Sequence, residues 1–456
     1  QILSIGGLTG AIMKIAQQGF SLWSSSIEGI RSFGGAIFGI GCDLSPALLA
    51  VGYIVGRNIS ILIFTGGALS WLVAIPIYSA ANGWEGDAHS AAWIIWNTKI
   101  RYLGVGAMVV GGIWSLIKLA KPLISGISSS IIAYSNTTSN TEIDLEEQDI
   151  PIKYVLILLL ALLIPIFFLY LDIINNVGIA CLLSIVMLIF GFLFSAVASY
   201  MAGIVGSSNN PISGVTIATI LFSSLLLLAL LGSGSTEGAA SAILIGAVVC
   251  CAAAIGGDNL QDLKTGNIVG ATPWKQQIMQ IVGVISSALV LGLVLDILHT
   301  AYTIGSPNFP APQATLMKSV AEGVFSGNLP WNMVKIGAII GVIIIILDII
   351  QEKRGSSFRL PVLAVAVGIY LPIELSTPIL LGGLISHFTQ NKSNKNNKGL
   401  LFASGLITGE ALMGITVALP IFITGNTDWW SQITGSAWIG TIPFLIIFLL
   451  FYKIAK

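Results

Sequence analysis

A long stretch without charge sets the first limit on how this chain can fold. Between Ile173 and Thr236 the sequence contains no Asp, Glu, Lys, Arg or His. A membrane-spanning helix needs roughly 20 mostly apolar residues, so this stretch can hold two such helices and a turn. Hydrophobic residues make up 55% of the chain and charged residues 9%, against about 25% charged in soluble domains. The sequence therefore predicts an all-α, polytopic membrane helix bundle.

Similar apolar runs recur along the whole chain. Pro165, Pro372 and Pro378 lie inside such runs, where a bilayer tolerates them because neighbouring groups satisfy the freed backbone. Each run is a candidate membrane span. The clearest candidates are Ile59–Tyr78, Ile100–Leu119, Val155–Leu171, Gly178–Val205, Ile212–Gly232, Ala239–Ile255, Ile278–Leu298, Val334–Ile350, Leu360–Ile385, Leu400–Ile423 and Trp438–Phe451.

Charge, cysteine and histidine usage argue against several other classes of protein. Twenty basic and twenty acidic residues cancel, so nothing suggests a nucleic-acid partner. The four cysteines lie in apolar segments without CxxC spacing, so neither a disulfide framework nor a zinc site is expected. The three histidines form no HExxH pair, which argues against an intramembrane metalloprotease. We therefore expect no cofactor, no protein-bound metal and no enzyme.

An internal repeat appears when Ala50–Ser70 is set over the sequence 316 residues later, where eight of 21 positions are identical. The copies are interrupted near their centres, at Gly56–Asn58 and at Pro372–Glu374. Paired interrupted segments are typical of the binding region of a secondary transporter. We predict two pseudo-symmetric repeats with broken or re-entrant helices. The identical pairs are Ala50/Ala366, Val51/Val367, Gly52/Gly368, Ser60/Ser376, Ile63/Ile379, Gly66/Gly382, Gly67/Gly383 and Ser70/Ser386.

The repeat also predicts the domain organisation. Residues 1–124 form the C-terminal part of a first membrane repeat, 125–150 a polar inter-repeat linker, and 151–456 the second repeat with a C-terminal helix. The first copy would start about 170 residues before Gln1, and we expect that length to be missing from this chain. Basic clusters flank Leu360–Gln390 on both sides, so the positive-inside rule favours a re-entrant segment broken at LPIELSTP.

Two polar stretches interrupt the apolar pattern. GGDNLQDLKTGNIVG, from Gly256 to Gly270, places charges among glycines at the end of an apolar run. A helix broken here would present free N–H and C=O groups to charged substrate ends, whereas a polar loop at the membrane surface is the alternative. SSNNPISG is either a plain turn or a polar hairpin facing the pathway. The candidate substrate-binding residues are Asp258, Asn259, Gln261, Asp262, Lys264, Thr265, Asn209 and Asn210.

Glu374 lies at the break of the second repeat copy and is a further substrate-binding candidate. Its counterpart in the first copy is Asn58, beside Arg57. A carboxylate in one copy and a guanidinium in the other are the groups that a site for a zwitterion needs. The alternative is an interfacial glutamate that caps a half-helix.

Glu410 is the candidate proton carrier. It is the only ionisable group between Leu400 and Thr424, and it lies near the middle of that apolar run. A charge in a bilayer core costs on the order of 3 kcal/mol, which makes an acid there a functional candidate by default. A glutamate paired with a buried lysine for packing is the alternative.

Long motifs give the chain a resemblance to a known family. GGDNLQDLKTGNIVGATPWKQQ resembles the signature of the oligopeptide transporter family, which includes the yellow-stripe-like metal-chelate carriers. The resemblance continues in VGSSNNPISGVTIAT, LPVLAVAVGIYLPIELSTPILLGGLI and GLLFASGLITGEALMGI, and it covers nearly the whole chain. It implies a multi-pass protein of the cell membrane that imports small peptides, or metal ions held by chelators, by proton-coupled symport.

Physical reasoning assigns expected roles within that resemblance. Asp258, Asp262 and Glu374 would meet a substrate ammonium or a chelated cation, Lys264 would meet a carboxylate, and Glu410 would carry the proton. An intact chelate is expected if metal is carried, because the sequence has no His or Cys cluster to strip the metal. A channel and an intramembrane hydrolase are the rival classes. The sequence leaves the oligomeric state open, a homo-oligomer among the alternatives.

Overall fold

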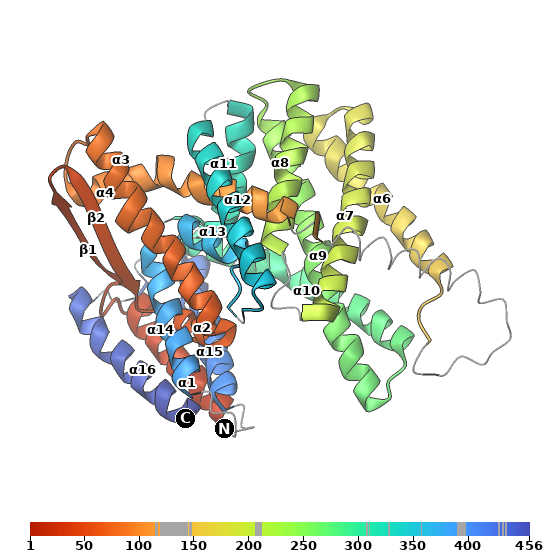
Figure 1. Ribbon diagram of the computed structural model, residues 1–456. Helices are drawn as coiled ribbons and strands as arrows, with labels where there is room; N and C mark the ends of the chain where they lie inside the picture. Colours follow the sequence, from red (N-terminus) through yellow and green to blue (C-terminus); the bar gives the residue numbers. More distant parts are fainter. Residues whose placement is uncertain are drawn as a thin grey trace. The chain divides into compact units, whose positions relative to one another are not determined.

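We describe the protein from a computed structural model (Figure 1). The predicted linker at 125–150 lies outside the described residues except for 145 and 148–150. Packing divides the chain into two compact units, of which the first comprises Gln1–Met108, Gly292–Pro312 and Pro330–Lys456, and the second Val109–Leu291 and Gln313–Leu329. The described residues are 1–114, 117–118, 145, 148–205, 212–306, 309, 311–326, 329–356, 358–389, 398–426, 429–430, 433 and 436–456.

Nine helical segments within the described residues are long and apolar enough to cross a membrane, which confirms the predicted all-α, polytopic architecture. In two of them, Ile152–Ile174 and Pro273–Tyr302, only 6% of the most apolar window is buried, as expected of helices that face lipid. The other seven are Pro46–Asn82, Val177–Tyr200, Gly214–Leu231, Glu237–Val269, Trp331–Lys353, Lys398–Thr424 and Trp438–Ala455.

The second unit is built around one long helix, α9 (Thr236–Val269), which packs against α7 and α8. Small residues allow this close packing: a Cβ added to Gly256 of α9 would lie 2.5 Å from the hydroxyl of Ser199 on α7. The other helices of this unit are α6 (Ile152–Ile174), α7 (Val177–Val205), α8 (Ile212–Leu231), α11 (Pro312–Ser326) and most of α10 (Pro273–Tyr302).

The first unit packs its helices in two pairs, α1 with α15 and α2 with α13–α14 (Figure 1). The α-helices are α1 (Ile2–Lys14), α2 (Pro46–Ala68), α3 (Ile75–Asn82), α4 (Ala88–Ile95), α12 (Trp331–Lys353), α13 (Val362–Tyr370), α14 (Ile373–Thr389), α15 (Lys398–Thr424) and α16 (Thr441–Ala455). Short π-helical turns follow α1, α2 and α4, at Ile15–Gly19, Leu69–Ala74 and Trp96–Ile100, and a 3₁₀ turn at Ala437–Gly440 precedes α16.

The first unit also contains an antiparallel hairpin of β1 (Ser26–Phe33) and β2 (Ala36–Asp43) that the sequence analysis did not predict. Its two-residue turn is formed by Gly34 and Gly35, whose positive φ angles of 57° and 86° match the strand twist. The hairpin packs on α3, α4 and α14, and the hydroxyl of Thr377 donates to the carbonyl of Gly41 at 2.6 Å.

Both predicted interruptions of the repeat are present. In the first copy Gly56 has φ 82° and ψ 170°, which breaks the helical path of α2. In the second copy α13 ends at Tyr370, Leu371 is extended and α14 begins at Ile373. Proline at 372 fits this boundary because it disfavours helical backbone in the residue before it. Leu360–Ile385 is therefore two short helices rather than one span.

The contacts between α2 and α13–α14 follow the repeat residue by residue. A Cβ added to Gly52 would lie 2.7 Å from the carbonyl carbon of Ile379, and one added to Gly368 would lie 2.8 Å from that of Ile63. These are the same contact with the copies exchanged, so the pseudo-symmetry is confirmed. Two further contacts pair in the same way: Gly66 with Val365 and Gly382 with Leu49, then Gly67 with Ser376 and Gly383 with Ser60.

A second symmetric set of contacts relates α1 to α12 and α15 to the helix at 101–114. Gly6 faces the carbonyl of Phe402, as Gly337 faces the carbonyl of Leu103. Gly405 faces the carbonyl of Leu3 in the same manner as Gly106 faces the carbonyl of Val334. The first compact unit thus contains elements of both copies. The division at residues 124 and 151 concerns the repeats rather than the packing units and stays a prediction.

Candidate functional site

Glu410 lies at the junction of three helices in the first unit. Its carboxylate accepts from the hydroxyl of Ser45 at 2.9 and 3.0 Å and from the backbone N–H of Ala47 at 2.9 Å. The ammonium of Lys14, at the end of α1, is 3.5 Å from its Oε1. Glu410 itself is buried, with 9% of its surface exposed. The acid of α15 is therefore bonded to the first turn of α2 and to α1.

The partners of Glu410 are two hydrogen-bond donors at the start of α2 and one cation. A carboxylate at a helix N-terminus is favoured by the free N–H groups and the helix dipole, here those of α2. Ser45 is also the N-cap of α2, since its hydroxyl accepts from the N–H of Leu48 at 3.3 Å. Lys14 supplies the buried lysine of the alternative interpretation. The role of Glu410 as proton carrier stays a prediction.

Asp43 lies beside this cluster, at the end of β2 and outside the nine candidate spans. Its Oδ1 accepts from the N–H of Ser45 at 2.8 Å. Burial raises the pKa of Asp43 to about 7 and the Glu410 carboxylate also raises it, while the Ser45 N–H and Lys14 act in the opposite direction. Asp43 therefore changes charge near neutral pH.

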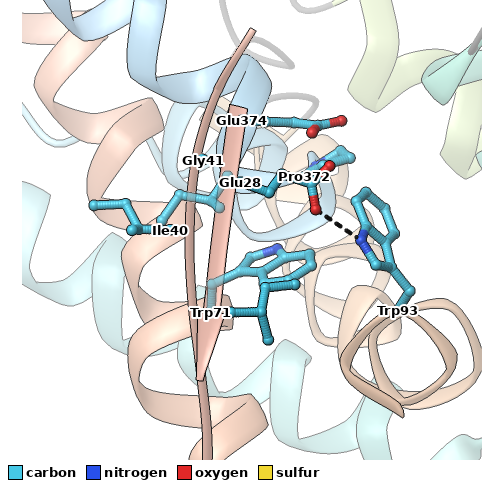
Figure 2. Close-up of a pocket in the computed structure, with 9 residues that line it drawn as sticks. Glu28, Ile40, Gly41, Trp71, Trp93, Pro372 and Glu374 are labelled. Carbon is cyan, nitrogen blue, oxygen red and sulfur yellow. Dashed lines mark hydrogen bonds between the residues drawn. The ribbon is translucent and has the colours of Figure 1, made fainter. Parts of the chain in front are cut away.

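Glu374 occupies the start of α14 and faces the hairpin. Its carboxyl group hydrogen-bonds that of Glu28 on β1. Gly41 lies between the two stems: a Cβ there would be 3.1 Å from Glu374 Cβ and 3.3 Å from Glu28 Cγ. Figure 2 shows Glu374 above Glu28, with Trp71 on the other side of Glu28. The Oε2 atom of Glu374 is buried and has no hydrogen-bond partner among the described residues.

Glu28 is held by two side chains of α4. The indole N–H of Trp93 donates to its Oε2 at 3.1 Å, drawn as a dashed line in Figure 2. The Nε2 of His89 is also 3.1 Å from Oε2. The side chain of His89 is 58% exposed and that of Glu28 is 21% exposed. Solvent therefore reaches this cluster from the His89 side.

The structure places Glu374 and Arg57 in different contacts and does not bring the two groups of the predicted zwitterion site together. Arg57 contacts His387 at 3.2 Å, whereas Glu374 shares a cavity lining with Trp71. Arg57 and Trp71 lie on the same continuous run of helix, roughly 20 Å apart at 1.5 Å per residue. The exchanged contacts relate the two copies by an approximate two-fold axis. The two repeat breaks therefore lie at opposite ends of the interface between α2 and α13–α14.

A larger cavity opens between the hairpin, α14 and α16. Its volume is about 900 Å³, within the range of small-molecule sites. The walls are mainly apolar, with Thr377, Glu28 and Arg31 as polar groups. Its apolar walls include Leu381, Phe444, Leu445, Phe448 and Leu449.

The predicted helix break at GGDNLQDLKTG is wrong. The helix α9 continues through this stretch to Val269, and its C-cap is Gly270. Glycine is tolerated in a helix interior, and these glycines permit close helix contacts instead: Gly256 lies against α7 and Gly266 against Gln276 of α10. The stretch therefore exposes side chains rather than free backbone groups.

The polar residues of this stretch make helix contacts within the second unit. Asp262 accepts from Gln280 at 2.7 Å through its carboxylate and from Gln276 at 3.1 Å through its carbonyl, while Thr265 donates to the carbonyl of Gln261 at 2.9 Å. Asp258, Asn259 and Lys264 lie on the same helix. Asn209 and Asn210 are outside the described residues.

Sequence reasoning did not single out Lys14, Ser45 and Asp43 beside Glu410, or Glu28 and His89 beside Glu374. The hairpin had a local signal, a Gly-Gly turn flanked by partly alternating apolar residues. The contacts of Glu410 join residues that are more than 300 positions apart, as for Ser45 and Glu410, and Glu28 is 61 positions from His89. No local pattern reports such pairs.

Comparisons with known proteins agree with these observations. The model of the family described as OPT oligopeptide transporter protein matches residues 3–421. A predicted oligopeptide transporter of Haemophilus influenzae is 32% identical over 98% of this chain and 78% of its own length. A predicted oligopeptide transporter of Saccharomyces cerevisiae is 30% identical over 35% of this chain and 23% of its own length.

A relative from rice extends the comparison to the metal-chelate branch. This predicted metal-nicotianamine transporter of Oryza sativa subsp. japonica is 24% identical over 84% of this chain and 57% of its own length. The family match spans the cluster around Glu410, the cluster around Glu374 and the polar stretch of α9. The chain is a multi-pass membrane protein of the transporter class, and it belongs to the oligopeptide transporter family.

Proposed function

We propose that this protein imports small oligopeptides together with protons. The observation that carries this proposal is the cavity of about 900 Å³ between the hairpin, α14 and α16. A short peptide is a zwitterion with variable side chains. The cavity offers Glu28 for an ammonium group, Arg31 for a carboxylate and apolar walls that can accept different side chains.

The proton acts in this proposal at Glu410. When ionised, the carboxylate joins α15 to Lys14 of α1 and to the first turn of α2. Protonation removes the ion pair and weakens the charge-assisted hydrogen bonds, each of which is worth about 1.5–3 kcal/mol. The junction of the three helices would therefore be tight with Glu410 charged and loose with Glu410 neutral, which links proton uptake to helix movement.

The residues of the α9 stretch stay candidate substrate-binding residues within the second unit. Asp258, Asn259, Gln261, Asp262, Lys264 and Thr265 present both signs of charge on one helix. Glu374, predicted from the sequence to meet an ammonium group or a chelated cation, lies in a cavity with room for about one water and is left out of the peptide site proposed here. Asn209 and Asn210 stay candidates from the sequence alone. The matching mutational test is uptake by Asp258→Asn and Lys264→Gln variants, which should lose affinity for charged peptide ends.

Import of an intact metal chelate is the second candidate function. The rice relative named as a metal-nicotianamine transporter, which matches 84% of this chain, favours it. A metal chelate contains a cation, so the acidic side chains proposed for a peptide ammonium could also contact it. Substrate competition therefore has to separate the two functions.

The substrate test uses the full-length protein in proteoliposomes with an inward proton gradient. A labelled tetrapeptide and an iron–chelator complex are offered side by side. Gradient-dependent peptide uptake that the chelate competes weakly supports the proposal. Uptake of metal and chelator together, with peptide ignored, would reassign the protein to metal-chelate import, and uptake without a gradient would refute proton coupling.

The role of Glu410 is tested by Glu410→Gln. We expect loss of gradient-driven uptake and retention of exchange between labelled and unlabelled peptide. Glu322→Gln is the matched control, because Glu322 also pairs with a lysine, Lys318 at 3.8 Å, but is 57% exposed. Loss of both activities in Glu410→Gln, with normal folding, would contradict the coupling role.

A further inference from the structure

The hairpin connects the two acidic clusters of the first unit. Glu28 on β1 belongs to the cluster at Glu374, and Asp43 on β2 belongs to the cluster at Glu410. The register places Glu28 opposite Gly41, two residues before Asp43. Asp43 interacts electrostatically with both Glu374 and Glu410. A line of ionisable groups therefore follows the hairpin from one cluster to the other.

The contact between Glu28 and Glu374 requires a proton. An ionised carboxylate can only accept hydrogen bonds, so two carboxyl groups that hydrogen-bond each other share one proton. The Oε2 of Glu374, buried and without a partner among the described residues, points to the same conclusion, since a buried charge is costly unless it is bonded. This oxygen is free to bind or pass on a proton.

The solvent end of the line is His89. Exposure falls along the sequence of contacts, from 58% for the side chain of His89 to 21% for Glu28 and to the buried Oε2 of Glu374. Histidine is the side chain whose unperturbed charge change falls between pH 5 and 8. The Nε2 of His89 is 3.1 Å from Glu28, within reach for direct proton transfer.

The cavity at Glu374 favours a proton over a peptide group at this position. It is lined by Glu28, Trp71, Trp93, Pro372 and Glu374. The volume within which the centre of a water molecule can move is only about 10 Å³. That is space for about one water and too little for the ammonium end of a peptide. A single water here would bridge carboxyl groups that do not touch.

The far end of the line is Glu410. Asp43 accepts from the N–H of Ser45, whose hydroxyl donates to both carboxylate oxygens of Glu410. The charged and titratable groups that face this end are Cys42 and Asp43 on β2, Lys14 on α1 and Glu410 on α15. Lys14 is the only cation among these groups. It contacts Glu410, the last carboxyl group of the line.

We propose that the hairpin β1–β2 carries a proton path from solvent to Glu410, through His89, Glu28, Glu374 and Asp43. Each step moves one proton: imidazolium Nε2–H gives it to Glu28, and Glu28 gives it to Glu374, across their contacts. Among the described residues no direct hydrogen bond joins Glu374 to Asp43 or Asp43 to Glu410, so each of these two transfers passes through a bridging water. Each donor is restored by the proton that follows, so no other reactant is needed. This inference rests on the proposed proton coupling and adds the route by which the proton arrives.

The test measures proton entry and peptide exchange separately in proteoliposomes of the full-length protein. A pH-sensitive dye inside reports proton entry driven by peptide, and counterflow without a gradient reports peptide exchange. His89→Ala should slow peptide-driven proton entry about tenfold and affect counterflow much less. Added imidazole should restore the rate, because a small buffer can deliver protons to Glu28 where the side chain is missing. His299→Gln, on α10, is the control.

The interior of the path is tested by Glu374→Gln, which should stop proton entry, keep peptide counterflow and not respond to imidazole. If this variant fails to fold, the His89→Ala arm decides alone. Normal proton entry in His89→Ala, or slow entry that imidazole does not restore, would overturn the path while leaving proton coupling intact. Absence of coupling in the wild type would instead remove the proposed function on which the path depends.

Discussion

The interface of α2 with α13 and α14 gives a sharp prediction because its closest contacts are between backbones. Adding a Cβ to Gly52 or Gly368 places it 2.7 or 2.8 Å from a carbonyl carbon of the facing helix. Carbon atoms prefer about 3.5–4.0 Å, so the helices would have to separate by about 1 Å. No side-chain rotation can relieve this contact, because the backbone fixes the position of the Cβ and the facing atom is a main-chain carbonyl carbon.

The expected magnitude follows from two opposing terms. Overpacking costs about 1–3 kcal/mol, and the upper end applies where the contact is backbone to backbone. Replacing glycine by alanine within a helix returns about 1 kcal/mol through helix propensity. We therefore expect Gly52→Ala and Gly368→Ala each to lower the free energy of unfolding by about 2 kcal/mol. Gly283→Ala on α10, where nothing lies within 4 Å of the added Cβ, should raise it instead.

The assay is thermal unfolding in detergent, followed by tryptophan fluorescence and by recovery of monodisperse protein. The three variants are compared with the wild type at equal protein and detergent concentrations. Both interface variants should melt below the wild type and Gly283→Ala at or above it. Equal stability of Gly52→Ala and Gly283→Ala would refute the backbone contact, and a large difference between Gly52→Ala and Gly368→Ala would refute the symmetry of the interface.

Three further predictions concern the charged clusters and the cavity. Asp43 holds its proton more tightly when folded, so the free energy of unfolding should fall by up to about 4 kcal/mol between pH 4 and 7, and Asp43→Asn should remove this slope in thermal melts across that range. Ser45→Ala should cost about 1–2 kcal/mol through loss of the α2 cap, measured by chemical denaturation. Arg31→Ala should raise KM for a tripeptide about tenfold and leave KM for its C-terminal amide unchanged in uptake assays; equal effects on both would contradict the carboxylate contact.

The repeat and its interruptions could be predicted from the sequence because identical residue types at equivalent positions are visible in the primary structure. Gly52, Gly66 and their counterparts are conserved between the copies since each fits against the backbone of the other copy. The break at Pro372 was also readable, because proline restricts its predecessor whatever the tertiary context.

The α9 stretch misled the sequence analysis for a physical reason. Glycines next to charges indicate a broken helix only if the glycines adopt non-helical angles, and composition does not report angles. In α9 the helix continues because Gly256 and Gly266 are required for close packing by neighbouring helices. The pairing of Glu410 with Lys14 was unreadable for a different reason, because it depends on which helices pack together.

The interlocked glycines of α2, α13 and α14 also limit how the protein can move. Helix α2 and the α13–α14 segment touch backbone to backbone at symmetric points, so they cannot slide along each other without collisions at every point at once. The pair must therefore move as one solid piece during any transport cycle, with the bending placed at its ends rather than within it. Distances between probes on α2 and α14 should stay constant during transport, while distances from either helix to α15 should change. The pair can therefore serve as the reference against which movements of the other helices are measured.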